Sequence, residues 1–195
     1  KLGEEVMGTM PALFKQQLGD EFFRIDSDDS APELGRRHAV VNGYHFLAVQ
    51  PDYYWTGYGY SSEMLDWIDA KLKAITKESP EKYVFVTSHP PLYETVFGSC
   101  TPSWSDSSLK KVLEKYPQVI YFSGHIHNVL QDEIQISQNG YMTAADCGSV
   151  KYTDWMNNVN ENLTRFDNDC GTRINDFSQG LLVQVDKSGN VKITR

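Results

Sequence analysis

Apolar and polar positions alternate with two different periods along the middle of the chain. Between residues 61 and 79 apolar side chains recur at three- and four-residue steps, which predicts a helix that Pro80 ends. The same reasoning predicts a helix over 106–116, stopped before Pro117. Runs rich in β-branched and aromatic residues predict strands at 44–49, 83–87 and 119–122. This order of strand, helix, strand, helix and strand is typical of a layered α/β fold.

Turn signals add hairpins around this alternating unit. Residues 37–41 and 44–49 flank Asn42-Gly43, the strongest short hairpin signal. The run 44–49 is almost wholly apolar, which predicts a strand buried on both faces. The remaining predicted elements are a helix at 9–18, a hairpin of 132–137 with 141–145, and a hairpin of 180–186 with 191–194.

Charge and composition exclude several classes of protein. The chain has 195 residues, with 18 basic against 26 acidic residues and a net charge of −8. Without a run of Lys or Arg, a groove for the nucleic-acid backbone is not expected. No apolar run approaches the roughly 18 residues of a membrane helix, so no membrane span is expected. Three cysteines are too few for a disulfide framework, although Cys100 and Cys170 could pair in their polar loops.

Three of the five histidines follow predicted buried strands. His89 follows the strand 83–87, and His125 and His127 follow the strand 119–122. Because ligands of open α/β sheets gather at the carboxyl ends of strands, we expect these imidazoles to meet. Neutral imidazole is a common ligand of divalent metals, so the pattern indicates a metal or catalytic site. His38 and His45 lie within the first hairpin, where local hydrogen bonding explains them.

Two motifs give the chain a family resemblance. Residues 87–92 read Thr-Ser-His-Pro-Pro-Leu, and residues 123–127 read Ser-Gly-His-Ile-His. Together and in this order they resemble the last two blocks of the calcineurin-like metallophosphoesterases, over roughly residues 38–195. The resemblance implies a layered α/β/β/α metallo-dependent phosphatase-like sandwich. The three earlier blocks, Asp-x-His, Gly-Asp-x-x-Asp and Gly-Asn-His-Glu/Asp, do not occur in the chain.

The resemblance implies hydrolysis of a phosphomonoester or phosphodiester by water activated by two divalent ions, Mn, Fe or Zn. His89 and His125 would bind one ion and His127 the other. The missing blocks would supply the other ligands and the catalytic histidine, so no catalytic residue is assigned within this chain.

The missing blocks suggest that the chain is the carboxyl-terminal half of a metallophosphoesterase domain. Residues 1–37 would follow the missing half-domain, and residues 38–195 would form the carboxyl-terminal part. We expect such a chain to bind metal weakly, to be inactive alone, and to associate with itself or with its missing half through an exposed sheet edge and apolar face.

The substrate would be a small phosphorylated molecule, and two loops are candidates to bind it. Aromatic residues of the loop 92–105 and of the loop 151–179 could stack on a nucleobase, pack on a lipid or protein, or pack within the loops. They are Tyr93, Phe97 and Trp104 in the first loop and Tyr152 and Trp155 in the second.

Two further features favour packing over chemistry. The aromatic stretch 53–60 could line a binding site, but it more often covers the edge of a core. Cys147 is interpreted as a small buried residue rather than a nucleophile.

Two other functions fit the same residues. The chain could be a non-catalytic scaffold or binding module with a degenerate, incomplete metal site. It could also be a mononuclear zinc hydrolase in which His89, His125 and His127 share one ion.

Overall fold

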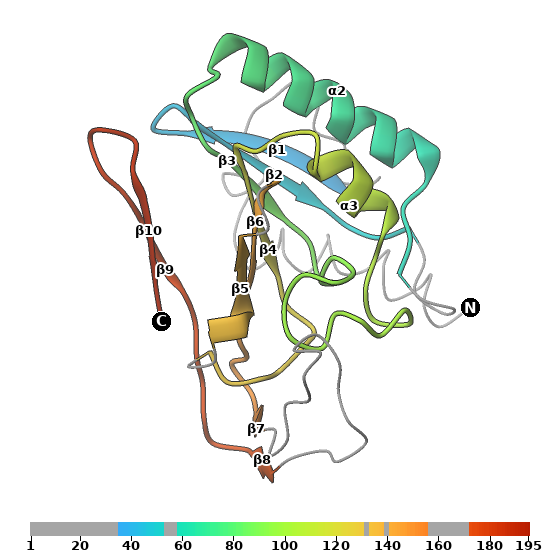
Figure 1. Cartoon of the computed structure of the whole chain (residues 1–195), viewed down its shortest axis with the longest axis vertical. Helices are drawn as coiled ribbons and strands as arrows, with labels where there is room; N and C mark the ends of the chain where they lie inside the picture. Colours follow the sequence, from blue (N-terminus) through green and yellow to red (C-terminus); the bar gives the residue numbers. More distant parts are fainter. Residues whose placement is uncertain (1–34, 53–57, 131–132, 139–140, 156–171) are drawn as a thin grey trace, which may run out of the picture.

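The computed structural model describes residues 35–52, 58–130, 133–138, 141–155 and 172–195. The predicted helix at 9–18 and Cys170 lie outside these residues. The described part is a mixed α/β structure around a six-stranded sheet with the order β1-β2-β3-β4-β6-β5 (Figure 1). Its strands are β1 (Arg36–Val41), β2 (Tyr44–Val49), β3 (Val84–Thr87), β4 (Val119–Ser123), β5 (Ile136–Gln138) and β6 (Thr143–Asp146).

The four central strands, β2, β3, β4 and β6, are parallel, and each edge strand is antiparallel to its neighbour. Along the chain, helix α2 (Ser62–Glu78) follows β2 and precedes β3, and helix α3 (Ser108–Leu113) follows β3 and precedes β4. The predicted alternation of strands and helices is therefore confirmed. As parallel neighbours, β3 and β4 end side by side at the same edge of the sheet.

The hairpin of β1 and β2 forms as predicted around Asn42-Gly43. Both turn residues have positive φ, 51° for Asn42 and 76° for Gly43, the conformation that this dipeptide favours. The prediction that residues 44–49 are buried on both faces is only half right. Leu47 and Val49 are buried beneath the helices, whereas Phe46 on the other face is 37% exposed.

Helix α2 matches its predicted boundaries because local signals define both ends. The Ser61 hydroxyl accepts a hydrogen bond from the Met64 amide at 3.3 Å, a regular N-cap. The side chains of the inner face, Met64, Ile68, Leu72 and Ile75, are buried.

Helix α3 is shorter than the predicted 106–116. Its N-cap residue is Ser107, and the carboxylate of the preceding Asp106 accepts a hydrogen bond from the Leu109 amide at 2.6 Å. After Leu113 the chain tightens into i to i+3 bonds, in which the amides of Lys115 and Tyr116 donate to carbonyls three residues earlier.

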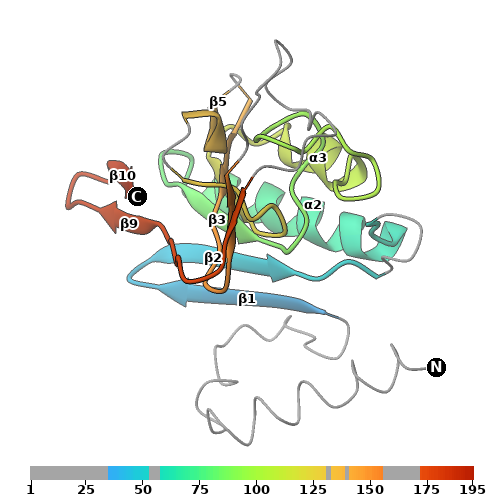
Figure 2. The ribbon, with the colours of Figure 1, turned by 90° about the horizontal axis from the view of Figure 1, so that it is seen from below.

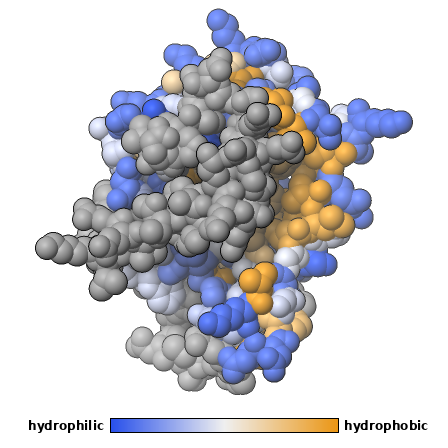
Figure 3. All heavy atoms as spheres, turned by 180° about the vertical axis from the view of Figure 1, so that it is seen from behind, coloured by the Kyte–Doolittle hydropathy of each residue, from blue (hydrophilic) through white to orange (hydrophobic). Residues whose placement is uncertain are grey.

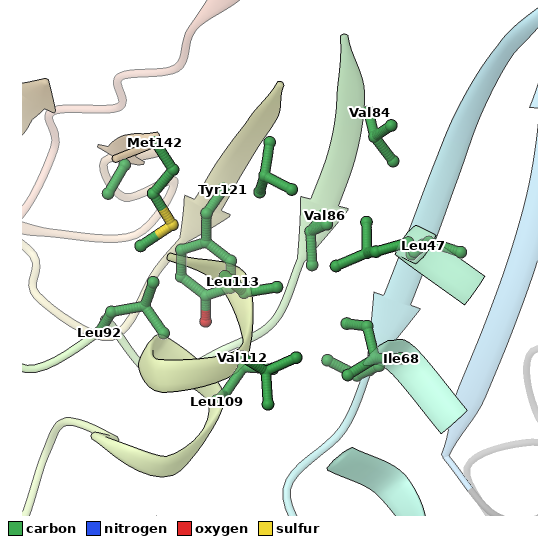
Figure 4. Close-up of a cluster of buried hydrophobic side chains, with 14 of the residues drawn as sticks. Leu47, Ile68, Val84, Val86, Leu92, Leu109, Val112, Leu113, Tyr121 and Met142 are labelled. Atoms are coloured by element: carbon green, nitrogen blue, oxygen red, sulfur yellow. The ribbon is translucent and has the colours of Figure 1, made fainter. Parts of the chain in front are cut away.

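Both helices pack on one face of the sheet (Figures 1 and 2). A continuous apolar core lies between the helices and the sheet. In it, the Tyr121 ring is surrounded by side chains of α3, by Leu92 from the loop after β3 and by Met142, just before β6 (Figure 4). Helices α2 and α3 form one layer over the six-stranded sheet, and the further layers of the sandwich remain a prediction.

The opposite face of the sheet carries aromatic side chains. The rings of Phe46, Phe85 and Phe122 are stacked across β2, β3 and β4, with centroids 4.8 and 6.3 Å apart. Apolar side chains also reach the surface, with Val40 48% and Val41 51% exposed on edge strand β1. Figure 3 shows an apolar patch on the back of the molecule. Self-association through such surfaces remains a prediction.

Two small antiparallel sheets complete the described part. One contains β7 (Thr153–Trp155) and β8 (Thr172–Ile174), and the other contains β9 (Leu182–Val185) and β10 (Val191–Thr194). The β9–β10 pair confirms the predicted terminal hairpin. Among the described residues, no helix has the length and apolar character needed to cross a membrane.

Candidate functional site

The candidate histidines lie in two loops at the carboxyl ends of β3 and β4. His89 follows β3, while His125 and His127 follow β4, in the turn that Gly124 opens. Since β3 and β4 are parallel neighbours, these loops emerge together. The structure thus brings His89 and His125 into contact, as the order of strands and motifs predicts.

Several hydrogen bonds fix the first loop against the second. The Gly124 amide donates to the His89 carbonyl at 3.0 Å, and the Ser88 amide donates to the Phe122 carbonyl at 3.1 Å. The buried Tyr60 hydroxyl bonds the Ser88 hydroxyl at 2.7 Å, and the Tyr121 hydroxyl donates to the Pro90 carbonyl. The histidines are therefore held by main-chain contacts and not by their own side chains alone.

Two imidazole nitrogens face each other across the loops. His89 Nε2 lies 3.1 Å from His125 Nδ1, with the ring planes nearly perpendicular at 85°. Two nitrogens that bind one ion at about 2.1 Å each lie roughly 3.0–3.4 Å apart for angles between square and tetrahedral. The observed distance is that of a hydrogen bond between two imidazoles, and it also fits two ligands of a single ion. The donor set of this pair therefore fits the metal that the family resemblance implies.

His125 adopts a backbone conformation that favours glycine. Its φ is +73°, in the left-handed region, which costs an ordinary residue roughly 1–2 kcal/mol. Such conformations persist where the surroundings dictate them, and they cluster at functional sites. The left-handed conformation therefore lowers the stability of the fold while it fixes the position of the His125 imidazole.

Burial keeps the contacting imidazoles in the form that metals bind. It lowers the pKa of His89, with a smaller contribution from the nearby His127. It also lowers the pKa of His125 to about 4, helped by the two neighbouring imidazoles. Both rings are thus neutral at pH 7, and neutral imidazole is the metal-binding form.

His127 lies close to this pair but has its own surroundings. Its Nδ1 is 3.4 Å from the hydroxyl of the buried Ser149, and its ring centroid is 4.2 Å from that of Tyr152. Across the described ranges, no three or more His, Cys, Asp or Glu side chains are grouped so as to hold one metal ion. The mononuclear alternative, in which all three histidines share one ion, stays a prediction.

Sequence reasoning assigned Tyr58 to a stretch that covers the core edge, but the structure places it against the histidines. Its hydroxyl lies 3.1 Å from His125 Nδ1, and its ring contacts both His89 and His125 edge-on. Ser149 was missed as well. Neither residue belongs to a motif, and their spacing along the sequence gives no signal of these contacts.

The three candidate substrate residues of the loop 92–105 are placed differently from one another. Trp104 is 39% exposed, and its ring lies edge-on to that of His125 with centroids 5.7 Å apart. Tyr93 is half-buried. Phe97 is fully buried and offers no surface to a ligand. In the second loop, Tyr152 contacts His127, while Trp155 is the last residue of β7.

Asp146, at the carboxyl end of β6, is a buried acid that sequence reasoning did not single out. It lies opposite Ser123 of β4, and within the described residues its Oδ1 has no hydrogen-bond partner. Burial raises its pKa to about 8. Burial also raises the pKa of the neighbouring Cys147 thiol to about 11, which agrees with a packing role for that residue.

Comparison with known proteins finds a distant structural neighbour. No family model matches the chain, and no curated protein matches its sequence. Among solved structures, it is similar to the crystal structure of a dimetal phosphatase from Danio rerio, with a TM-score of 0.46 and 12% identity. The match covers 60% of this chain and 50% of that one, so the chain spans half the length of its neighbour. The function has therefore to be inferred from the histidines and their contacts.

Proposed function

We propose that this chain supplies the metal-binding histidines of a phosphoesterase that hydrolyses a phosphomonoester or a phosphodiester. The observation that carries the proposal is the 3.1 Å contact between His89 Nε2 and His125 Nδ1. It lies where two parallel strands end together, the usual place for ligands in α/β sheets. The proposed substrate is a small phosphorylated molecule.

His89 and His125 would hold one ion in this proposal, and His127 a second one. The remaining ligands and the catalytic histidine would come from a preceding segment, as the family resemblance implies. Divalent Mn, Fe or Zn would supply a Lewis acid that polarises the phosphoryl group and activates a water. With only imidazole ligands, the chain alone is expected to bind metal weakly and to be inactive.

The protein's own contribution is to position the ligands and restrict access to them. The bond between the Gly124 amide and the His89 carbonyl sets the separation of the two loops. The rings of Trp104 and Tyr152 cover one side of His125 and of His127, respectively. Partial exclusion of water in this way strengthens electrostatic interactions with a bound anion.

Cobalt binding tests the proposal, with visible absorption as the readout. The unsubstituted chain should bind Co²⁺, and His89→Ala should weaken binding more than about tenfold, since loss of an outer-sphere partner alone costs 10–100-fold. His38→Ala is the matched control, because His38 contacts another imidazole away from these loops. Unchanged Co²⁺ affinity in His89→Ala would refute the proposal.

Hydrolysis of p-nitrophenyl phosphate and of bis(p-nitrophenyl) phosphate is a second test, made on the natural protein that contains this sequence. We expect turnover that a chelator abolishes and that His125→Ala lacks. The two substrates separate a monoesterase from a diesterase.

A second candidate is a non-catalytic scaffold or binding module with a degenerate, incomplete metal site. The cobalt titration separates the two candidates, since a degenerate site would bind no Co²⁺ through His89 and His125.

A further inference from the structure

Two polar groups from separate segments meet at one atom of His125. The Nδ1 of this imidazole lies 3.1 Å from the Tyr58 hydroxyl and 3.1 Å from His89 Nε2. The Tyr58 ring stands edge-on to the His125 ring, with centroids 5.3 Å apart, and to the His89 ring at 6.0 Å. The phenol thus lies beside the proposed ion-binding pair.

A ring nitrogen can form only one well-aligned hydrogen bond or metal bond at a time. Nδ1 has one in-plane position, which holds either a proton or a lone pair. If that lone pair binds an ion, it is no longer an acceptor for the phenol. The Tyr58 hydroxyl can rotate about its C–O bond, so its proton can turn to an acceptor that lies beside the ion.

We propose that Tyr58 is a catalytic residue whose hydroxyl donates a hydrogen bond to a phosphoryl oxygen of the substrate. This inference rests on the proposed function and adds a group that binds the substrate directly. During phosphoryl transfer, negative charge is spread over the equatorial oxygens, and fixed donors stabilise that charge. Hydrogen bonds to charged acceptors are roughly twice as strong as neutral ones.

Chemistry favours this role over direct binding of the ion by Tyr58. A phenol must lose its proton to act as an anionic ligand, and imidazoles are already the donors suited to these divalent ions. A neutral phenol hydroxyl, by contrast, can donate its proton in a hydrogen bond. The Tyr58 oxygen lies 3.1 Å from His125 Nδ1, so it would be within reach of an anion held by an ion at that nitrogen.

The test uses the chain with Co²⁺ and phenylphosphonate, a phosphate-ester analogue that is not hydrolysed. Tyr58→Phe removes the hydroxyl and keeps the ring. We expect its Co²⁺ affinity to stay within about twofold of the unsubstituted protein, because no ligand is lost. The dissociation constant for phenylphosphonate, measured by ³¹P NMR on the Co²⁺-loaded protein, should rise about tenfold or more, the value of one hydrogen bond to a charged group.

Tyr83→Phe is the matched control, since Tyr83 lies at the opposite end of β3 and is partly exposed. It should leave both affinities unchanged. Equal phenylphosphonate affinity in Tyr58→Phe and in the unsubstituted protein would overturn the inference. So would a large loss of Co²⁺ affinity in Tyr58→Phe, which would identify Tyr58 as a ligand.

Failure of the proposed function has a different signature. In that case the unsubstituted protein itself would bind no Co²⁺ through His89 and His125, and the role of Tyr58 would be refuted with it. If the inference alone fails, Co²⁺ and phenylphosphonate still bind the unsubstituted protein, and only the effect of Tyr58→Phe is absent.

Discussion

Two pairs of histidines make similar contacts in different surroundings. His89 Nε2 and His125 Nδ1 lie 3.1 Å apart, and His38 Nε2 and His45 Nδ1 lie 2.8 Å apart. The first pair joins two loops at the carboxyl ends of parallel strands. The second pair lies within the β1–β2 hairpin, with its rings stacked at an angle of 17°. A close contact between imidazoles is therefore not enough to define a functional site.

The surroundings explain the difference between the pairs. Strand hydrogen bonds already fix the positions of His38 and His45, and burial lowers the pKa of both. Two neutral rings can then satisfy each other, which is a structural role. The other pair comes with a left-handed backbone at His125, an adjacent phenol and a third imidazole nearby. A strained backbone of this kind does not stabilise the fold. Such backbone conformations cluster at binding and active sites.

Zinc should separate the two pairs most strongly. At a free Zn²⁺ concentration of about 100 times its dissociation constant, binding adds about 2.7 kcal/mol to the free energy of unfolding. We expect His125→Ala to lose this increase and His45→Ala to keep it, as measured by denaturant unfolding with and without Zn²⁺. The comparison fails if His45→Ala loses the increase or His125→Ala retains it.

Glycine substitutions should have opposite effects at the two pairs. Because His125 has a φ of +73°, His125→Gly should be about 1 kcal/mol more stable than His125→Ala. In the regular strand β2, His45→Gly should be about 0.5–1 kcal/mol less stable than His45→Ala. Urea unfolding of the four variants without metal measures both differences. The same sign at both positions would contradict a strained turn at His125.

Acid should destabilise the protein partly through the hairpin pair. Burial lowers the pKa of His38 below its ordinary 6.5, so the unfolded chain binds more protons as the pH falls below that value. The stability contributed by the neutral ring is present above pH 6.5 and is lost on acidification. His38→Gln should lose less stability between pH 7.5 and 5.5, by up to about 1 kcal/mol. An identical pH dependence in both proteins would show that this residue does not contribute.

The smallest expected effect concerns the charges around His45. Burial lowers the pKa of this imidazole, Glu78 raises it, and Lys82 lowers it. Lys82→Met should therefore raise the pKa of His45, because it removes a positive charge that disfavours protonation of the ring. An NMR titration of the His45 ring measures the change, and Lys77→Met serves as a charge-matched control. A lowered pKa in Lys82→Met would contradict this assignment.

The elements that could be predicted from sequence are those whose signals are local. Ser61 and Pro80 bound α2, and Asn42-Gly43 specifies the hairpin through its own backbone preferences. The early end of α3 could not be predicted, because it coincides with a tertiary contact. There the Tyr116 hydroxyl donates to the Asp69 carboxylate of α2 at 2.9 Å.

The candidate site was predictable only as far as strand order determines it. Parallel strands that follow one another bring their carboxyl ends together, so the meeting of His89 and His125 follows from topology. The contacts of Tyr58 and Ser149 depend on the paths of irregular loops, which no periodic pattern encodes. The burial of Asp146 could not be predicted either, because it depends on the pairing of β6 with β4, in which Asp146 lies opposite Ser123.

The hydrogen bond between the Gly124 amide and the His89 carbonyl also makes the site observable. The proton of that amide can exchange with solvent only when the two loops separate. Its exchange rate therefore reports how often the histidine pair opens, without any bound ion or substrate. An ion held between the two imidazoles would slow that exchange, so a single backbone amide would register occupancy of the site.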